Sequence, residues 1–230
     1  MVAIRAAIWD FNGTIDNSEH IREKSIRVSL ADFGRTFHES DYPTIMKLVG
    51  FDLPAGYISA RYEIGNPQKF RKHWELRFRE IFESDLALLP GVAQTISAMR
   101  EKGLRLAIAS SAYRDYIETS LQRLGIGDQF EAVVTRDDIT GPGKPDPEAF
   151  RLAAETIGVH ATNCVVVGDT ESDLEGAIGA GMRMIYVPGW YELAISLKEG
   201  VTTLSSLENF NWNVVKQLEG QPVASRERAY

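Results

Sequence analysis

The sequence has very little cysteine: a single residue, Cys164, in a chain of 230. One cysteine excludes an internal disulfide and any metal cluster built from thiolates. Cys164 lies inside an apolar run, so we expect a buried and unreactive thiol. Long apolar runs are also missing, since no stretch approaches the ~20 residues that span a bilayer and the run within residues 1–10 is too short for a secretory signal. The sequence therefore predicts a cytoplasmic protein with no membrane partner.

The chain also lacks an excess of positive charge. It carries 25 Lys and Arg against 32 Asp and Glu, a formal net charge of −7, whereas nucleic-acid binding needs a basic surface. We therefore expect no nucleic-acid partner. With 44% hydrophobic and 25% charged residues, the composition is that of a globular protein. The length allows one large domain or a core with a smaller insert.

Short apolar runs alternate with helical patterns over most of the chain. The runs that predict strands buried on both faces cover residues 3–11, 104–109, 132–134, 164–167 and 184–187. The helical patterns cover residues 92–102, 113–124, 147–157 and 174–180. Strands that alternate with such helices predict βαβ units, and hence a Rossmann-like α/β core around a central parallel sheet. Ligands of such sheets bind at the carboxyl ends of the strands.

Residues 16–85 break this alternation and predict an inserted α-helical cap domain. Asp16 with Glu19 three residues later is typical of a helix start. Aromatic residues recur every four positions from Phe70 to Phe82, which indicates one amphipathic helix. We expect the core to comprise residues 1–15 and 86–220, the cap residues 16–85, and a frayed tail residues 221–230.

Polar or charged residues stand where four of the predicted strands end: Asp10, Ser110, Thr135 and Asp169. Each local sequence also has an ordinary structural interpretation. Asn12-Gly13 is a strong hairpin-turn signal, Ser110-Ser111 fits a polar strand end, and Lys144 fits a solvated lysine in a turn. Asp169 and Asp173 equally fit Mg²⁺ ligands or a helix N-cap with a first-turn acid. Taken singly, these motifs leave both interpretations open.

Taken together and in order, the motifs resemble those of the haloacid dehalogenase-like hydrolases, most of which are phosphatases. The resemblance covers residues 4–187 and rests on Asp10–Thr14, Ser110-Ser111, Gly143–Pro147 and Gly168–Asp173. A helical insert directly after the first motif is similar to the subgroup with phosphoglycolate phosphatases, phosphonatases, β-phosphoglucomutases and 2-haloacid dehalogenases. The resemblance implies an Mg²⁺-dependent hydrolase of a small organic phosphomonoester, whose cap selects the substrate.

The resemblance also implies a role for each motif. Asp10 is the expected nucleophile, which forms an aspartyl phosphate. Ser110, with Ser111 beside it, and Lys144 are expected to bind the phosphoryl group. Mg²⁺ is expected to be held by Asp10, by the backbone carbonyl of Asn12, by Asp169 and by Asp173.

These residue types fit the chemistry. A phosphate dianion repels an incoming carboxylate, so Mg²⁺ and the ammonium of Lys144 must offset that charge and keep Asp10 ionised. Glycine permits close backbone approach, so the N–H groups near Gly13 and Thr14 are candidates to hold phosphate oxygens. Attack by Asp10 then gives a covalent intermediate that water hydrolyses.

Asn12 departs from the family pattern, in which a second aspartate two residues after the nucleophile protonates the leaving oxygen and then activates water. An amide can hydrogen-bond but cannot transfer that proton, a loss of roughly 10²–10⁴ in rate. Three explanations stay open: an engineered change, an enzyme whose leaving group needs little protonation or draws its proton from elsewhere, and a phospholigand-binding protein without turnover. His20 and Glu171 are candidate substitutes, each with a plain surface position as the alternative.

Other activities of the family fit less well. A leaving halide needs no proton, but Lys144 with Asp169 and Asp173 suits a metal-bound phosphate better than a dehalogenase. A phosphonatase needs a Schiff-base lysine in the cap, and no cap lysine stands in a recognisable context. A mutase needs a carboxylic acid in place of Asn12.

The last predicted cap helix is rich in basic residues between Lys69 and Arg79. One or two of them, with Arg61 or Lys47, are candidates to bind an anionic tail of the substrate. A solvated helix face is the simpler interpretation.

Overall fold

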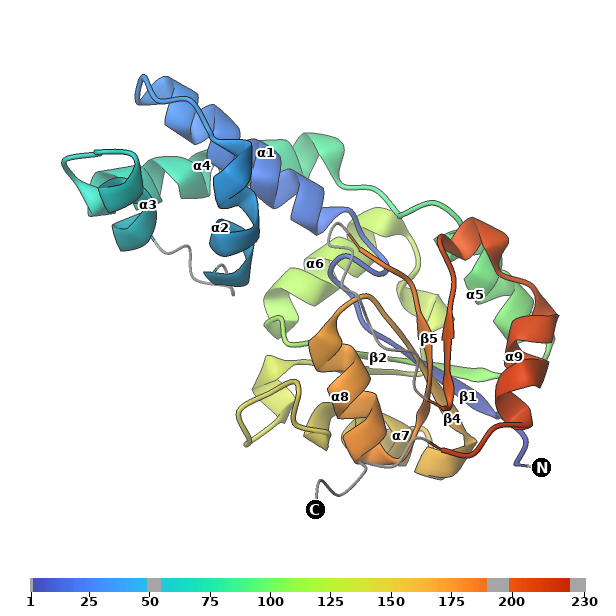
Figure 1. Cartoon of the computed structure of the whole chain (residues 1–230). Helices are drawn as coiled ribbons and strands as arrows, with labels where there is room; N and C mark the ends of the chain where they lie inside the picture. Colours follow the sequence, from blue (N-terminus) through green and yellow to red (C-terminus); the bar gives the residue numbers. More distant parts are fainter. Residues whose placement is uncertain (1, 49–54, 190–198, 224–230) are drawn as a thin grey trace, which may run out of the picture. The chain divides into compact units, whose positions relative to one another are not determined.

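The chain divides into two compact units (Figure 1). The computed structural model describes residues 2–48, 55–189 and 199–223. The core unit comprises Met1–Asp16 and Ala87–Tyr230, and the cap unit comprises Asn17–Leu86. The cap unit is thus a single insertion between the first strand and the rest of the core.

The core unit is built on a parallel six-stranded sheet with the strand order β3-β2-β1-β4-β5-β6. The strands are β1 Ala6–Trp9, β2 Arg105–Ala109, β3 Ala132–Val134, β4 Cys164–Gly168, β5 Arg183–Tyr186 and β6 Val201–Thr203. The order runs outward from β1 to β3 on one side and resumes at β4 on the other. In such sheets this reversal opens a crevice at the carboxyl ends of the two central strands. The predicted Rossmann-like fold class is confirmed.

Helices cover both faces of the sheet. Helices α5, α6 and α9 share one apolar cluster with Trp9, whereas α7 and α8 share the other with Ile8. Successive side chains of a strand point to opposite faces, so a fully buried strand such as β1 supplies both clusters. The bounds are α5 Val92–Glu101, α6 Arg114–Leu124, α7 Glu148–Thr156, α8 Glu171–Ala180 and α9 Trp212–Glu219.

Short 3-10 helices join several of these elements. They are η1 Glu39–Asp41, η2 Gly127–Gln129, η3 Arg136–Asp138, η4 Ala161–Asn163 and η5 Leu207–Asn209. Strand β6 and helix α9 were not predicted from the sequence. Strand β6 has three residues, of which only Val201 is buried, so its sequence carries no long apolar run.

The cap unit is helical in its described residues. Its helices are α1 Ser18–Asp32, α2 Tyr42–Leu48, α3 Ala55–Arg61 and α4 Pro67–Asp85. Helix α4 begins with Asn66, whose side-chain oxygen accepts a hydrogen bond from the Lys69 N–H at 2.9 Å. The aromatic residues Phe70 and Trp74 of α4 are buried in the apolar cluster of this unit, as the four-residue spacing predicted.

The predicted first residue of the first helix of the insertion, Asp16, was wrong. Helix α1 follows Asn17, and Asp16 belongs to the core unit. The Asp16 carboxylate accepts a hydrogen bond from the hydroxyl of Tyr116 at 3.1 Å. The backbone of Asp16 also forms isolated bridges with Asn12 and Leu88. The side chain is therefore engaged within the core.

The single cysteine and the C-terminal residues complete the description of the core unit. Cys164 is buried, and burial raises the pKa of its thiol to about 12, as expected of an unreactive cysteine. Of the predicted tail, residues 224–230 lie outside the described residues, whereas the Gln221 carbonyl accepts two hydrogen bonds from the guanidinium of Arg183, at 3.1 and 2.7 Å. Within the part of the chain that is described, no helix combines the length and apolar character needed to cross a membrane.

Candidate active site

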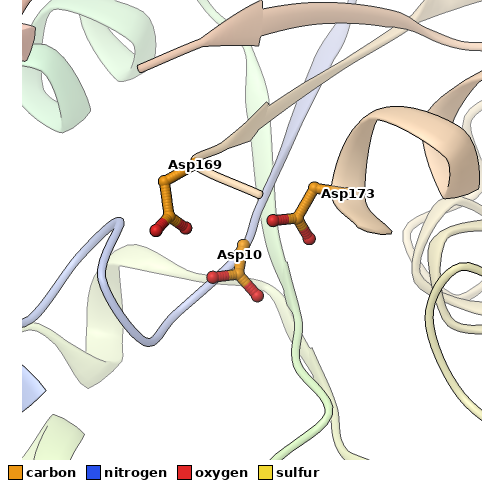
Figure 2. A group of neighbouring side chains, drawn as sticks. All are labelled: Asp10, Asp169 and Asp173. Atoms are coloured by element: carbon orange, nitrogen blue, oxygen red, sulfur yellow. The ribbon is translucent and has the colours of Figure 1, made fainter. Parts of the chain in front are cut away.

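Three buried carboxylates converge at the carboxyl ends of β1 and β4 (Figure 2). Asp10 directly follows β1, Asp169 directly follows β4, and Asp173 lies in the first turn of α8. Each offers an oxygen within 4.8 Å of the others. The cluster therefore occupies the crevice that the strand order creates.

Gly168 allows this close arrangement. A Cβ added at Gly168 would lie 2.9 Å from the Cβ of Asp173, closer than side chains can pack. The hydroxyl of Thr170 accepts the Asp173 N–H at 3.1 Å, and the Asp173 carboxylate accepts the Thr170 N–H at 3.1 Å. This reciprocal capping box fixes Asp173 through one oxygen, and the other faces Lys144. Asp173 is thus the first-turn acid of a helix whose N-cap is Thr170, and its role as a metal ligand stays a prediction.

Lys144 lies between two of these carboxylates. Its Nζ donates to Asp10 Oδ1 and lies 2.7 Å from Asp173 Oδ1, and its side chain is only 5% exposed. Burial lowers the pKa of the ammonium, but the neighbouring charges of Asp10 and Asp173 outweigh it and hold the pKa above its ordinary value. Lys144 is therefore a fixed cation, and not the solvated lysine of the alternative interpretation.

The negative charge of the cluster is only partly offset. Burial, followed by repulsion from Asp173, raises the pKa of Asp10 to about 7, although Lys144 acts in the opposite direction. Buried carboxylates this close together are costly to keep ionised. A divalent cation would neutralise them, and three carboxylate oxygens are the hard ligands that Mg²⁺ prefers. The residues present thus fit the magnesium site expected from the sequence.

The predicted phosphate-binding serines lie at the end of β2, beside β1. Ser110 is buried, and its Oγ accepts the Ala112 N–H at 3.1 Å. A hydroxyl that accepts one bond can still donate another. Ser111 borders the loop that carries Lys144, since a Cβ at Gly143 would lie 3.9 Å from Ser111 Oγ.

Thr135, at the end of β3, has a structural role. The Thr135 hydroxyl donates to Asp138 at 2.8 Å and caps η3. This arrangement gives Thr135 a local structural role.

The backbone after Asp10 forms a turn, as the Asn12-Gly13 pair indicated. The N–H groups of Gly13 and Thr14 donate to the carbonyl oxygens of Asp16 and Phe11, at 3.2 and 3.3 Å. Both N–H groups are thus engaged within the turn, and their role in holding phosphate oxygens stays a prediction. The Thr14 hydroxyl instead donates to Asp169 Oδ1 at 2.8 Å, which orients that carboxylate. Sequence reasoning missed this contact, because 155 positions separate the two residues.

Asn12 is part of a hydrogen-bond chain that the sequence did not indicate. Its Nδ2 donates to the hydroxyl of Tyr116 at 3.2 Å, and that hydroxyl donates to Asp16 Oδ2 at 3.1 Å. Tyr116 belongs to α6, and Asp16 is fully buried. Of the two candidate substitutes for an acid, Glu171 is exposed at the start of α8 and His20 is exposed in the cap unit.

A cavity of about 350 Å³ lies beside the Asp169 side of the cluster. Thr14 and Gly189 line it, and a Cβ at Gly189 would lie 2.5 Å from Asp169 Oδ2. Its other lining residues are Gly13, Leu89, Pro90, Val187, Pro188, Ser205, Ser206 and Leu207. The core unit thus has open space next to the acidic cluster.

The basic residues of α4 are largely engaged within the cap unit. Arg71 pairs with Glu75 at 2.9 Å, and Arg77 pairs with Asp32 at 2.7 Å. Arg61 of α3 pairs with Asp41 at 2.8 Å. These pairs favour the solvated-face interpretation of the helix. The side chain of Lys47 lies outside the described residues.

Known proteins resemble this chain in sequence and in fold. The family model for the haloacid dehalogenase-like hydrolase matches residues 7–187. The phosphorylated carbohydrates phosphatase of Thermotoga maritima is 26% identical over 183 residues, which cover 80% of this chain and 84% of that protein. The phosphoglycolate phosphatase of Escherichia coli O157:H7 is 32% identical over 152 residues, 66% of this chain and 59% of that protein. The structure of CbbY from Rhodobacter sphaeroides in complex with phosphate has a TM-score of 0.70 and 23% identity, over 90% of this chain and 96% of that chain.

Proposed function

The chain belongs to the haloacid dehalogenase-like hydrolase family, and we propose that it is an Mg²⁺-dependent phosphatase that hydrolyses a small organic phosphomonoester. The observation that carries this proposal is the buried cluster of Asp10, Asp169 and Asp173 with the Lys144 ammonium inserted between Asp10 and Asp173. Relatives named for phosphoglycolate and for phosphorylated carbohydrates support a small phosphate as the substrate class.

Asp10 is the nucleophile in this proposal. Its carboxylate attacks phosphorus, the bond from phosphorus to the leaving oxygen breaks, and an aspartyl phosphate forms. Water then attacks the same phosphorus and releases inorganic phosphate and the free carboxylate. Lys144 offsets the charge of the phosphoryl oxygens during both steps, and the buried Ser110 hydroxyl donates to one of them.

Asp10 and Asp169 would hold Mg²⁺ together with the backbone carbonyl of Asn12, and Asp173 would support them. The ion supplies neutralisation of the phosphate charge, so that an anionic nucleophile can approach an anionic substrate. Thr14 and Thr170 orient the carboxylates of Asp169 and Asp173 through their hydroxyls. These two threonines therefore preorganise the ligands before any ion binds.

Asn12 limits the leaving groups that the site can release. An amide cannot give a proton to an alkoxide, which needs one, whereas an aryl oxide leaves without it. We therefore expect faster turnover of aryl than of alkyl phosphates. Turnover of alkyl esters would be impaired, whereas turnover of esters with weakly basic leaving groups would not.

The test is phosphate release from a panel of aryl and alkyl phosphates, with Mg²⁺ and with a chelator. We expect turnover that requires Mg²⁺ and that Asp10→Asn lowers by several orders of magnitude. Asp128→Asn is the matched control, because Asp128 is exposed in the same unit. Activity that survives Asp10→Asn would exclude the nucleophile assignment.

The same panel tests position 12. We expect Asn12→Asp to raise alkyl turnover by roughly a hundredfold or more, the low end of general acid–base catalysis, and aryl turnover much less. If the wild-type protein and Asn12→Asp both bind phosphate esters but release no inorganic phosphate from them, the protein is a phospholigand-binding member of the family and not an enzyme.

A further inference from the structure

Tyr116 connects the amide of Asn12 to the buried carboxylate of Asp16. The two hydrogen bonds measure 3.2 Å and 3.1 Å, and they join the turn after β1, helix α6 and the last core residue before the insertion. Asp16 is fully buried, and Tyr116 is partly buried. Asn12 is separated by one residue from Asp10, the proposed nucleophile. This chain of hydrogen bonds therefore ends two residues from the proposed nucleophile.

The chemistry of these groups sets the direction of the hydrogen bonds. A carboxylate only accepts hydrogen bonds, so the Tyr116 hydroxyl must use its hydrogen toward Asp16. The oxygen of that hydroxyl can then only accept from Asn12, which places the amide nitrogen of Asn12 on the Tyr116 side. These hydrogen bonds thus fix the orientation of the Asn12 amide, which would otherwise be undetermined.

This inference rests on the proposed phosphatase function. We propose that Tyr116 and Asp16 are positioning residues that hold the Asn12 amide in the orientation in which it hydrogen-bonds the departing oxygen of the substrate. The Asn12 Nδ2 carries two hydrogens, and one of them is donated to the Tyr116 hydroxyl. In this proposal the other is donated to the departing oxygen, so that Asn12 stabilises the negative charge that develops there without transferring a proton. Preorganisation matters because an amide that must reorient during the reaction contributes less to the transition state.

The inference also narrows the substrate class. A hydrogen-bond donor stabilises a leaving oxygen whose conjugate acid is already fairly acidic, but it cannot replace a proton for an alkoxide. The site is therefore suited to aryl phosphates, acyl phosphates and phosphoanhydrides, whose leaving oxygens depart as anions. Sugar and alkyl phosphates are the poor substrates of this arrangement.

The experiment is a double-mutant cycle in which kcat/KM is measured for a series of substrates with different leaving groups. The proteins are the wild type, Tyr116→Phe, Asn12→Ala and the double variant, and the substrates are phosphates whose leaving groups range from nitrophenol to simple alcohols. We expect Tyr116→Phe to lower kcat/KM by about fivefold to tenfold for the most basic leaving groups, and less for the most acidic. In the Asn12→Ala background, Tyr116→Phe should have no further effect, because its action passes through Asn12.

A merely structural tyrosine would behave differently. It would lower turnover by the same factor for every leaving group, and by the same factor whether or not Asn12 is present. Either result, or an unchanged kcat/KM in Tyr116→Phe, would overturn the positioning role while leaving the phosphatase assignment intact. Tyr113→Phe is the matched control, because Tyr113 caps the same helix and is 55% exposed.

The positioning role of Tyr116 and the phosphatase function can be tested separately. If Asp10→Asn abolishes phosphate release while the Tyr116 variants match the wild type, only the positioning role fails. If the wild-type protein releases no phosphate from any substrate of the series, the proposed function fails and this inference fails with it. Thermal unfolding of Tyr116→Phe shows whether its fold is retained.

Discussion

The ammonium of Lys144 lies 2.7 Å from the Asp173 carboxylate, and the two groups are joined although they come from different parts of the chain. Lys144 stands in the loop before α7, and Asp173 in the first turn of α8. The same ammonium donates to Asp10. One buried cation thus bridges the proposed nucleophile and an acid of the expected metal site.

The first prediction follows from this bridge. Lys144→Met leaves the Asp10 and Asp173 carboxylates buried without their cation, and removing one partner of a buried pair costs about 3–5 kcal/mol of unfolding free energy. We also expect kcat to fall by roughly 10²–10³, the usual effect of losing a charge-stabilising group. Urea unfolding and aryl phosphate turnover measure the two effects. Lys216→Met, at an exposed position on α9, should match the wild type in both, and a Lys144→Met protein that also matched it would contradict the assignment.

The second prediction concerns the pH dependence of stability without metal. The pKa of Asp10 is raised in the folded protein, from an ordinary 3.8 to about 7, chiefly by burial. A raised pKa means that the folded state binds the proton more tightly than the unfolded state does. The contribution of Asp10 to stability is therefore full below about pH 4 and is lost as pH rises toward 7.

Asparagine has no such titration, so the comparison isolates Asp10. In a chelator, the Tm of Asp10→Asn minus that of the wild type should increase by several degrees between pH 4 and pH 8. Mg²⁺ should remove most of this difference at pH 8, because the ion favours the ionised carboxylate. A difference that stays constant with pH would show that Asp10 carries no buried-charge penalty.

The third prediction concerns the metal. An ion that binds only the folded state stabilises it by about 2.7 kcal/mol at a hundred times its Kd. Mg²⁺ should therefore raise the Tm of the wild type, and Asp169→Asn and Asp173→Asn should each reduce that rise. Glu171→Gln is the matched control, because Glu171 is exposed at the start of α8. Equal Mg²⁺ responses in all four proteins would place the metal elsewhere.

Much of the fold is readable from the sequence, because the central strands are buried on both faces and their runs are almost wholly apolar. β1 and β4 are examples. The capping box of Thr170 and Asp173 is equally local, since its partners are three residues apart. Edge strand β6 escaped prediction because it buries a single side chain. The local sequence pattern therefore predicts the central buried strands, but not this marginal edge strand.

The site divides in the same way. Asp10, Asp169 and Asp173 were placed by the rule that parallel strands bring their carboxyl ends to one edge. The contact between Asn12 and Tyr116 spans 104 positions and depends on how α6 packs against the turn after β1. Nothing in the local sequence of Tyr116 marks it as a partner of that turn. Long-range side-chain contacts of this kind require the packed structure.

The last prediction compares two buried serines on α1, one of which forms hydrogen bonds through its hydroxyl. The Ser25 hydroxyl donates to the Arg22 carbonyl of the same helix at 2.7 Å. The Ser25 hydroxyl accepts the Trp74 Nε1–H at 2.8 Å and so joins α1 to α4 within the cap unit. The Ser29 hydroxyl, one helical turn later and equally buried, has no hydrogen-bond partner among the described residues. Ser25→Ala leaves the indole N–H unsatisfied, which should cost about 1–3 kcal/mol.

Ser29→Ala removes a hydroxyl that lacks a partner, so it should be neutral or slightly stabilising. Urea unfolding monitored by tryptophan fluorescence measures both variants under the same conditions. Equal destabilisation by the two substitutions would mean that the loss reflects serine volume and not the bond to Trp74. A larger loss in Ser25→Ala shows that the hydrogen bonds of this hydroxyl, including the one that joins α1 to α4, stabilise the unit that is expected to select the substrate.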